Sequence, residues 1–136
     1  MTKLVTRLSY FMLLPDGYVR RVQTAWAEPT VRVERWRLTK VRHADGSVQR
    51  HVIGSAEGEG RISTRLISFE PITMSLTSSS GRVYCLAGPP GDDFNAANLY
   101  QRWLVTCGRT ELKDLSGALL RLRNMRLKHV GGKHDV

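Results

Sequence analysis

Residues 81–108, GRVYCLAGPPGDDFNAANLYQRWLVTCG, mark the change from strand-forming to helix-forming sequence in this chain. Residues 83–87 are apolar throughout, which is typical of a strand with both faces covered. The strand cannot continue through residues 88–91, because two prolines lack a backbone donor and two glycines tolerate unusual dihedral angles. Asp92 or Asp93 then suits a helix start, since a carboxylate accepts the free N–H groups of a first helical turn.

Two helices are predicted from here to the C-terminal region. The first covers residues 92–107 and ends at Gly108, a residue suited to a left-handed cap. Its apolar residues occupy two sides, so we expect it to lie against a sheet with Trp103 in the core. The second covers residues 111–126 and has a narrow leucine stripe. Residues 130–136 are expected to form a flexible tail.

The chain before residue 81 consists of predicted strands joined by turn signals. We expect a hairpin over residues 4–27 and a strand from residue 30 to 43, with a bulge near Glu34–Arg35 where the apolar residues change parity. Asp45–Gly46 is a strong hairpin signal. Three further strands follow, and the last precedes the helix. The expected fold is a single α+β domain over residues 1–129: a curved antiparallel β-sheet of six to seven strands, a meander close to a barrel, followed by two C-terminal helices.

Composition limits the class of protein. The chain has 136 residues and 41% apolar residues, enough for one domain with its own core. No apolar run is long enough for a membrane span, and Arg7 and Ser9 interrupt the N-terminal apolar residues, so we expect a cytoplasmic protein without a membrane partner. Two cysteines make no disulfide framework, and a Cys85–Cys107 bond is left open.

Charge is the strongest global signal. The net charge is +9, and it is concentrated in two regions: residues 1–54 carry +6 and residues 109–136 carry +4, whereas the middle of the chain is slightly acidic. A basic field of this kind attracts nucleic acid first and acidic proteins next. The alternative is that sixteen arginines against five lysines reflect codon bias in a GC-rich genome and say nothing of partners.

No set of residues points to catalysis. The segment before the first helix resembles a phosphate loop only in its glycines, since Asp92 and Asp93 would repel a phosphate. Metal-ligand residue types gather at His43, Asp45, His51, Glu57 and Glu59, but a two-residue turn at Asp45–Gly46 would place the two histidines on opposite faces. A three-residue turn would return them to one face. We expect no catalytic residues, no metal and no cofactor.

Arginines of the β-region carry the functional prediction. Arg35 and Arg37 flank Trp36, so they share one strand face, and other cations lie on neighbouring hairpin arms near Tyr18 and Trp26. Basic sheet faces with aromatic side chains hold single strands. The alternative is a solvated outer face. The predicted nucleic-acid-binding residues are Arg20, Arg21, Arg32, Arg35, Arg37, Lys40, Arg42, Arg50, Arg121, Arg123 and Arg126.

The sequence therefore predicts a small, basic, non-enzymatic binding module for RNA or single-stranded DNA. We expect Arg35, Arg37, Lys40 and Arg42 to form one continuous surface with the arginines of the second helix. The alternative is a protein-binding inhibitor or accessory protein, of the kind that phages and mobile elements carry, which acts on an acidic or nucleic-acid-processing partner. The sequence leaves the oligomeric state open.

Overall fold

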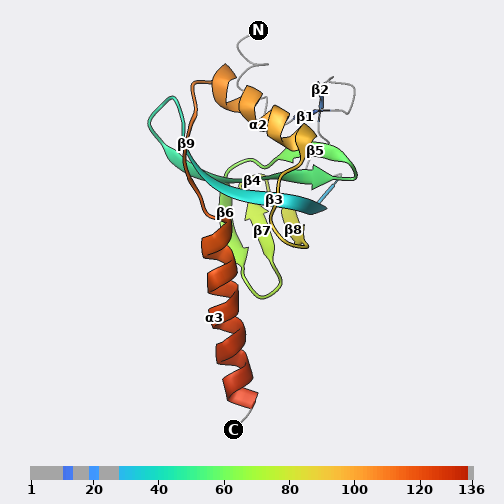
Figure 1. Cartoon of the computed structure of the whole chain (residues 1–136). Helices are drawn as coiled ribbons and strands as arrows, with labels where there is room; N and C mark the ends of the chain where they lie inside the picture. Colours follow the sequence, from blue (N-terminus) through green and yellow to red (C-terminus); the bar gives the residue numbers. More distant parts are fainter. Residues whose placement is uncertain (1–10, 14–18, 22–27, 135–136) are drawn as a thin grey trace.

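The computed structural model describes residues 11–13, 19–21 and 28–134. Its strands belong to one mixed sheet in the order β2-β1-β5-β4-β3-β8-β7-β6, with β9 paired to β3, and this sheet is not closed into a barrel (Figure 1). The elements are β1 (Phe11–Leu13), β2 (Val19–Arg21), β3 (Thr30–Arg42), β4 (Val48–Ala56), β5 (Glu59–Ile62), β6 (Leu66–Glu70), β7 (Ser75–Ser78), β8 (Val83–Ala87), α2 (Phe94–Thr106), β9 (Thr110–Asp114) and α3 (Ser116–His134).

The predicted α+β fold is thus confirmed, with a sheet followed by two helices. The first predicted hairpin is present as the antiparallel pair β1–β2, and the rest of residues 4–27 lies outside the described residues. One feature of the sheet differs from the prediction: β3 and β8 pair in parallel, so the sheet is not a pure meander. The long connection through β4 to β7 brings the chain back beside β3 in the parallel sense, which adjacent hairpins cannot do.

Strand β3 is the centre of the sheet. It pairs with β4 along most of its length, with β8 through its first half and with β9 through its second half. The predicted bulge is confirmed, because the register with β4 shifts between Glu34 and Arg37, and Arg35 has a φ of 47°. The bulge reverses parity, so Val33 and Trp36 point to the same side of the sheet. The long strand can therefore bury apolar residues on the same side before and after the bulge.

Two hydrophobic clusters cover the two sides of β3. On the first side, which we call the α2 face, helix α2 packs over the sheet (Figure 1), and the cluster consists of Val41, Ile53, Ile62, Ala96, Leu99, Tyr100 and Trp103. On the other side, the α3 face, the curved strands β7 and β8 and the start of α3 enclose a second cluster around Trp36, Leu38, Leu76, Tyr84 and Leu119. Strand β3 contributes Val31, Val33, Trp36 and Leu38 to the α3-face cluster and Val41 to the α2-face cluster.

The start of α2 agrees with its prediction. The Asp93 side chain caps the helix by accepting from the Ala96 N–H at 3.0 Å. The GPPG segment is fixed to β3, since the Trp36 indole donates to the Gly88 carbonyl at 3.0 Å and the Gly91 N–H donates to the Trp36 carbonyl at 3.1 Å. The helix ends at Thr106, and Gly108 follows with a φ of 61°.

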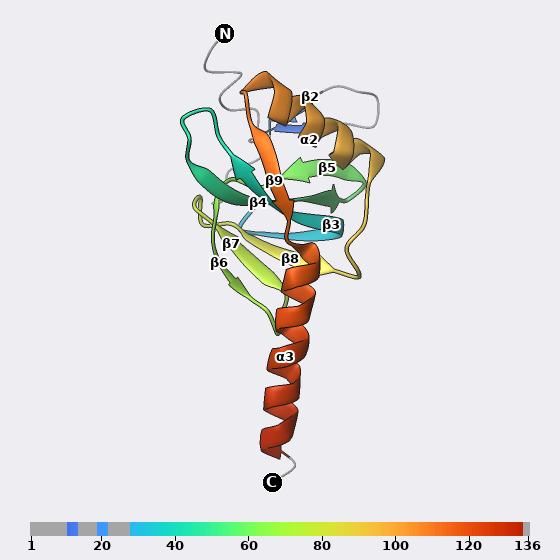
Figure 2. The same ribbon diagram turned by 60° about the vertical axis from the view of Figure 1, so that its left-hand side comes forward.

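The second helix differs from its prediction at both ends. Residues Thr110–Asp114 form strand β9 along the free half of β3 (Figure 2). All five of these residues are exposed, so the segment has no burial period by which sequence could identify it as a strand. The helix then continues to His134, through the region predicted as a tail. Gly131 and Gly132 lower helix propensity, but unlike proline they do not prevent a helix from forming. Most of α3 extends away from the body (Figure 1).

Gly60 allows α2 to approach β5 closely. A methyl group at this position would lie 2.6 Å from the Ala96 nitrogen and from the Asn95 carbonyl carbon, and these backbone atoms cannot move without shifting the helix. We expect Gly60→Ala to lower the free energy of unfolding by about 1–3 kcal/mol in urea denaturation. Gly91→Ala is the control, because its nearest neighbours would be Arg35 atoms at 3.9 Å. Equal stability of the two variants would contradict the close approach.

A candidate anion-binding face

Three cations stand in a row across neighbouring strands of the α3 face. Lys40 of β3 is the direct partner of Arg50 on β4 and of Lys113 on β9, so the three side chains leave the sheet on the same side. Like charges directly opposite each other destabilise a sheet. None of the three makes an ion pair with a carboxylate of the described residues, whose ion pairs lie elsewhere. The row is therefore uncompensated positive charge held by backbone register.

Beside this row lies a small cleft of about 190 Å³. Lys40 and Arg50 line it together with Arg65, which stands just before β6, and its other lining residues are Val48, Gln49 and Leu66. Among the described residues that line the space, three are cations and none is a carboxylate. Such a cleft suits a compact anionic group such as a phosphate, which accepts several charge-assisted hydrogen bonds at once.

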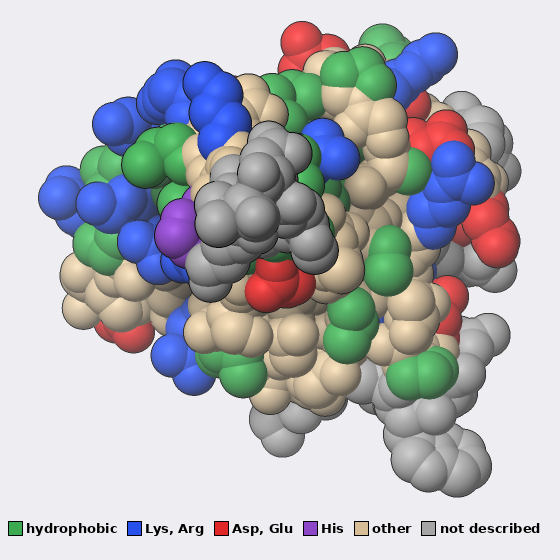
Figure 3. All heavy atoms as spheres, turned by 90° about the horizontal axis from the view of Figure 1, so that it is seen from below, with side chains coloured by type: hydrophobic (Ala, Val, Ile, Leu, Met, Phe, Trp, Pro, Cys, Tyr) green, Lys and Arg blue, Asp and Glu red, His purple; other side chains and the backbone are tan. Residues whose placement is uncertain are grey.

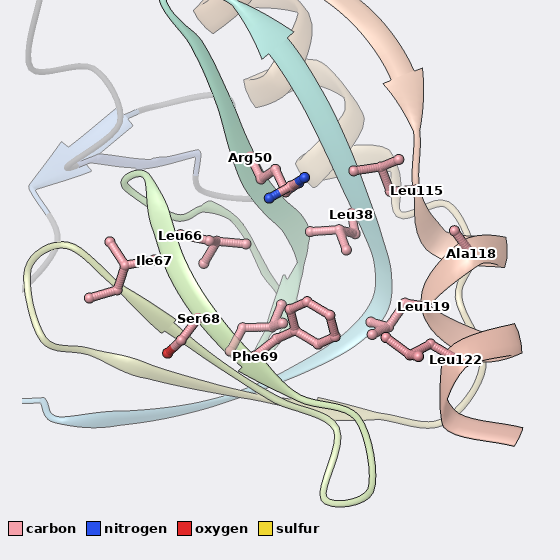
Figure 4. Close-up of a pocket in the computed structure, with 11 residues that line it drawn as sticks. Leu38, Arg50, Leu66, Ile67, Ser68, Phe69, Leu115, Ala118, Leu119 and Leu122 are labelled. Carbon is pink, nitrogen blue, oxygen red and sulfur yellow. The ribbon is translucent and has the colours of Figure 1, made fainter. Parts of the chain in front are cut away.

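An apolar groove of about 460 Å³ adjoins the cleft and shares Arg50 and Leu66 with it. Figure 4 shows the groove between strand β6 and helix α3, with Leu38 and Arg50 at one end. Its lining residues are Leu38, Arg50, Leu66, Ile67, Ser68, Phe69, Leu76, Leu115, Ala118, Leu119 and Leu122. The α3 face thus combines a cationic section with an apolar one.

Arg37, a predicted binding residue, is engaged on the opposite face. Its guanidinium donates to Glu111 at 3.0 Å and to Asp114 at 3.1 Å, and it lies over the Tyr100 ring. Burial works against ionisation of Asp114, but hydrogen bonds from Ser116 and Arg37 outweigh it, so the pKa of Asp114 is below its usual value. The expected single surface of Arg35, Arg37, Lys40 and Arg42 is therefore divided, because alternate residues of β3 point to opposite faces.

The remaining predicted residues fall into separate places. Arg35 and Arg37 do share a side, where they line a recess beside Asp92 and Asp93. Arg32 is exposed and pairs with Glu34 at 3.4 Å. Arg42 is exposed and follows Lys40 on the α3 face.

The arginines outside β3 and β4 extend the basic region only in part. Arg20 and Arg21 belong to β2, whose side chains lie outside the description. On α3, Arg121 and Arg126 are exposed, whereas Arg123 is half-buried and its Nε has no hydrogen-bond partner among the described residues. Seen along α3 from its end, Lys and Arg side chains gather on one side of the molecule (Figure 3).

Lys113 and Arg65 join the cationic cluster although the sequence did not indicate them. Lys113 falls in a segment predicted as helix, and only its register opposite Lys40 gives it a role. Arg65 ends the connection between β5 and β6 and lines the cleft together with Arg50. Each depends on a pairing between distant segments, for which periodicity gives no signal.

The histidines His43 and His51 lie on one face, contrary to the two-residue turn considered from sequence. The His43 N–H donates to the Ser47 carbonyl and β3 pairs Arg42 with Val48, so three residues form the turn. The two Nε2 atoms are 3.0 Å apart, and His51 Nδ1 lies 2.9 Å from the Ser63 carbonyl. Among the described residues, no three His, Cys, Asp or Glu side chains form a metal-binding group.

The surroundings of this pair keep both rings neutral. Arg109 donates to His43 Nδ1 at 3.0 Å, which leaves the His43 proton on Nε2, directed at His51. Burial, together with Arg109, lowers the pKa of His43. Burial, opposed by the Ser63 carbonyl but reinforced by His43 and Arg109, lowers the pKa of His51 to about 4. The pair is a structural hydrogen-bond chain of the core.

Comparison of the chain with protein families, with characterised proteins and with solved structures gives no match. Cys85 and Cys107 do not form a disulfide. None of the described helices is long and apolar enough to cross a membrane.

Proposed function

We propose that this chain is a non-enzymatic module that binds the phosphate backbone of RNA or single-stranded DNA on its α3 face. The observation that carries the proposal is the Lys113–Lys40–Arg50 row. A row of like charges across paired strands destabilises the free fold. A bound polyanion would offset this repulsion, which explains why the row is there. The net charge of +9 supports the same partner class, because it favours encounter with nucleic acid.

The geometry of the row favours an extended strand of phosphates. Neighbouring strands lie about 4.8 Å apart, so a phosphate chain that crosses β9, β3 and β4 meets one cation on each strand. Arg65 adds a further cation to the lining of the cleft, beside Lys40 and Arg50. Contacts of this kind fix position and carry no base information, so the binding should depend little on sequence.

The test is a double substitution, Lys40→Gln with Arg50→Gln. We expect weaker binding of a labelled single-stranded oligonucleotide in fluorescence anisotropy at low salt, because two phosphate contacts are lost. The dependence of log K on log salt should become shallower by up to about 1.4, at roughly 0.7 per contact. Unrelated oligonucleotide sequences should weaken alike.

A matched control removes the same charge elsewhere. Arg32 and Arg102 are exposed residues of other surfaces, and their double replacement by glutamine should leave the salt slope nearly unchanged. The stability of the Lys40/Arg50 variant should stay the same or rise by a few tenths of a kcal/mol, since a repulsive pair is removed. Absence of binding by the parent chain at low salt, or equal slopes in both double variants, would contradict the proposed function.

A further inference from the structure

The apolar groove of the α3 face leaves hydrophobic side chains uncovered. Leu66 and Phe69 of β6 point into the groove from one wall, Phe69 with an exposed fraction of 43%, and α3 forms the other wall (Figure 4). Phe69 is the register partner of the buried Leu76, so it faces the inside of the curved sheet without being covered there. Contiguous exposed apolar surface of this kind marks interaction sites.

Helix α3 carries the apolar wall beyond the body of the protein. Leu115, Ala118 and Leu122 line the groove, and Met125 continues their helical stripe with an exposed fraction of 67%. Residues 124–129 are all exposed. Helices of this length owe most of their stability to packing along an apolar face, and the outer half of α3 has none among the described residues. A partner lying along α3 would supply that packing.

The positive charge around the groove favours an acidic partner. Residues 116–134 of α3 contain five Lys or Arg and no Asp or Glu. Arg50 stands at the end of the groove, next to Lys40 and Arg65. A second copy of the chain would bring another basic α3 against the first, and the like charges would repel. Acidic residues flanking an apolar stripe would instead pair with the rim.

We propose that the groove between β6 and α3 is a docking site for an acidic amphipathic helix of a partner protein. A helix fits because the exposed stripe of α3 follows the 3.6-residue period that a second helix can pack against. Strand addition to β6 is less suited, because β6 has a register shift between Leu66 and Ser68, and bulges blunt sheet edges against pairing. This inference rests mainly on the groove and the basic helix α3, and it shares Arg50 and the neighbouring Lys40 and Arg65 with the proposed oligonucleotide site.

The experiment uses a labelled amphipathic peptide of about 20 residues, long enough to form a helix, with leucines at helical spacing and glutamates elsewhere. A matched peptide carries lysine in place of every glutamate. Anisotropy should show the acidic peptide binding at least about tenfold tighter than the basic one. Phe69→Ser and Leu122→Ser should each raise the Kd for the acidic peptide about tenfold or more, because they remove apolar anchors of the groove.

Controls separate the groove from other surfaces. Val105→Ser alters a largely exposed apolar residue on α2 and should leave the Kd unchanged. Met125→Ser, at an exposed residue of the same α3 stripe, repeats the test if Phe69→Ser does not fold. Equal binding of the two peptides, or a Kd indifferent to both groove substitutions, would overturn the proposal. Displacement of the acidic peptide by the fatty acid dodecanoate at a lower concentration than by unlabelled peptide would also overturn it. Loss of oligonucleotide binding in Leu122→Ser would likewise overturn it.

Discussion

Trp103→Ala should lower the free energy of unfolding by about 3–5 kcal/mol, as large aromatic deletions in cores do. Trp103 is fully buried at the centre of the cluster between α2 and the sheet. Its ring meets His51 edge-on at a centroid distance of 4.7 Å, and the Arg109 guanidinium lies 4.2 Å above it. Truncation therefore removes apolar burial and also the surface that holds the histidine pair and Arg109 in place.

Urea denaturation monitored by circular dichroism would measure this loss. Val105→Ala on the same helix is the matched control, because Val105 is largely exposed and its replacement should change stability by less than about 0.5 kcal/mol. Trp103→Phe should fall between the two, since it keeps a ring in the core and removes the buried Nε1, which has no hydrogen-bond partner among the described residues. A loss below about 1 kcal/mol for Trp103→Ala would show that α2 is not a core element.

Local sequence rules were sufficient for α2 and for the course of β3. The GPPG break, the Asp93 cap and the apolar spacing around Trp103 all act within one turn of helix, so sequence alone located the element. The parity change at Arg35 likewise predicted the bulge. Strand β9 escaped prediction because its five exposed residues pair with a strand about seventy positions earlier.

The candidate site was predicted only in part, because some of its residues are brought together by segments that are distant in sequence. Lys40 and Arg42 share a face by simple strand alternation, which the sequence indicated. Arg50 joins them only because the turn has three residues, since the two-residue turn considered from sequence would place it on the other face. Arg37 was assigned to the same surface, yet Glu111 and Asp114 of β9 neutralise it on the opposite face. The apolar groove was not foreseen, because Phe69 and Leu122 meet only through the curvature of the sheet and the exit of α3.

Protonation of His51 should destabilise the protein at mildly acidic pH. His51 is buried, and it accepts from His43 Nε2 while its own Nδ1 faces the Ser63 carbonyl. A proton on His51 Nε2 would point at the His43 N–H, and His43 cannot turn its donor away because Arg109 occupies Nδ1. Charging either ring therefore breaks the hydrogen-bond chain in the core.

The direction follows from the two pKa values. The pKa of His51 is about 4 in the folded protein against about 6.5 when unfolded, so between these values the unfolded chain binds more protons. Stability therefore falls as the pH decreases, by about 2 kcal/mol from pH 7 to pH 5 and about 3 kcal/mol by pH 4. Asp45 and Asp114 have lowered pKa values, so their contributions are lost only at still lower pH.

Urea denaturation at a series of pH values from about 7 to 5 tests this, because carboxylates titrate little in that window. His51→Gln should flatten the dependence by more than half, since the amide can donate to the Ser63 carbonyl and accept from His43 but cannot titrate. For each variant, the free energy of unfolding at one pH is compared with that at another. Any loss of stability from imperfect packing of the glutamine is the same at every pH and therefore cancels. His129→Gln, at an exposed position of α3, should keep the dependence of the parent chain. A parent protein equally stable at both ends of the window would show that His51 is charged or solvated in the fold.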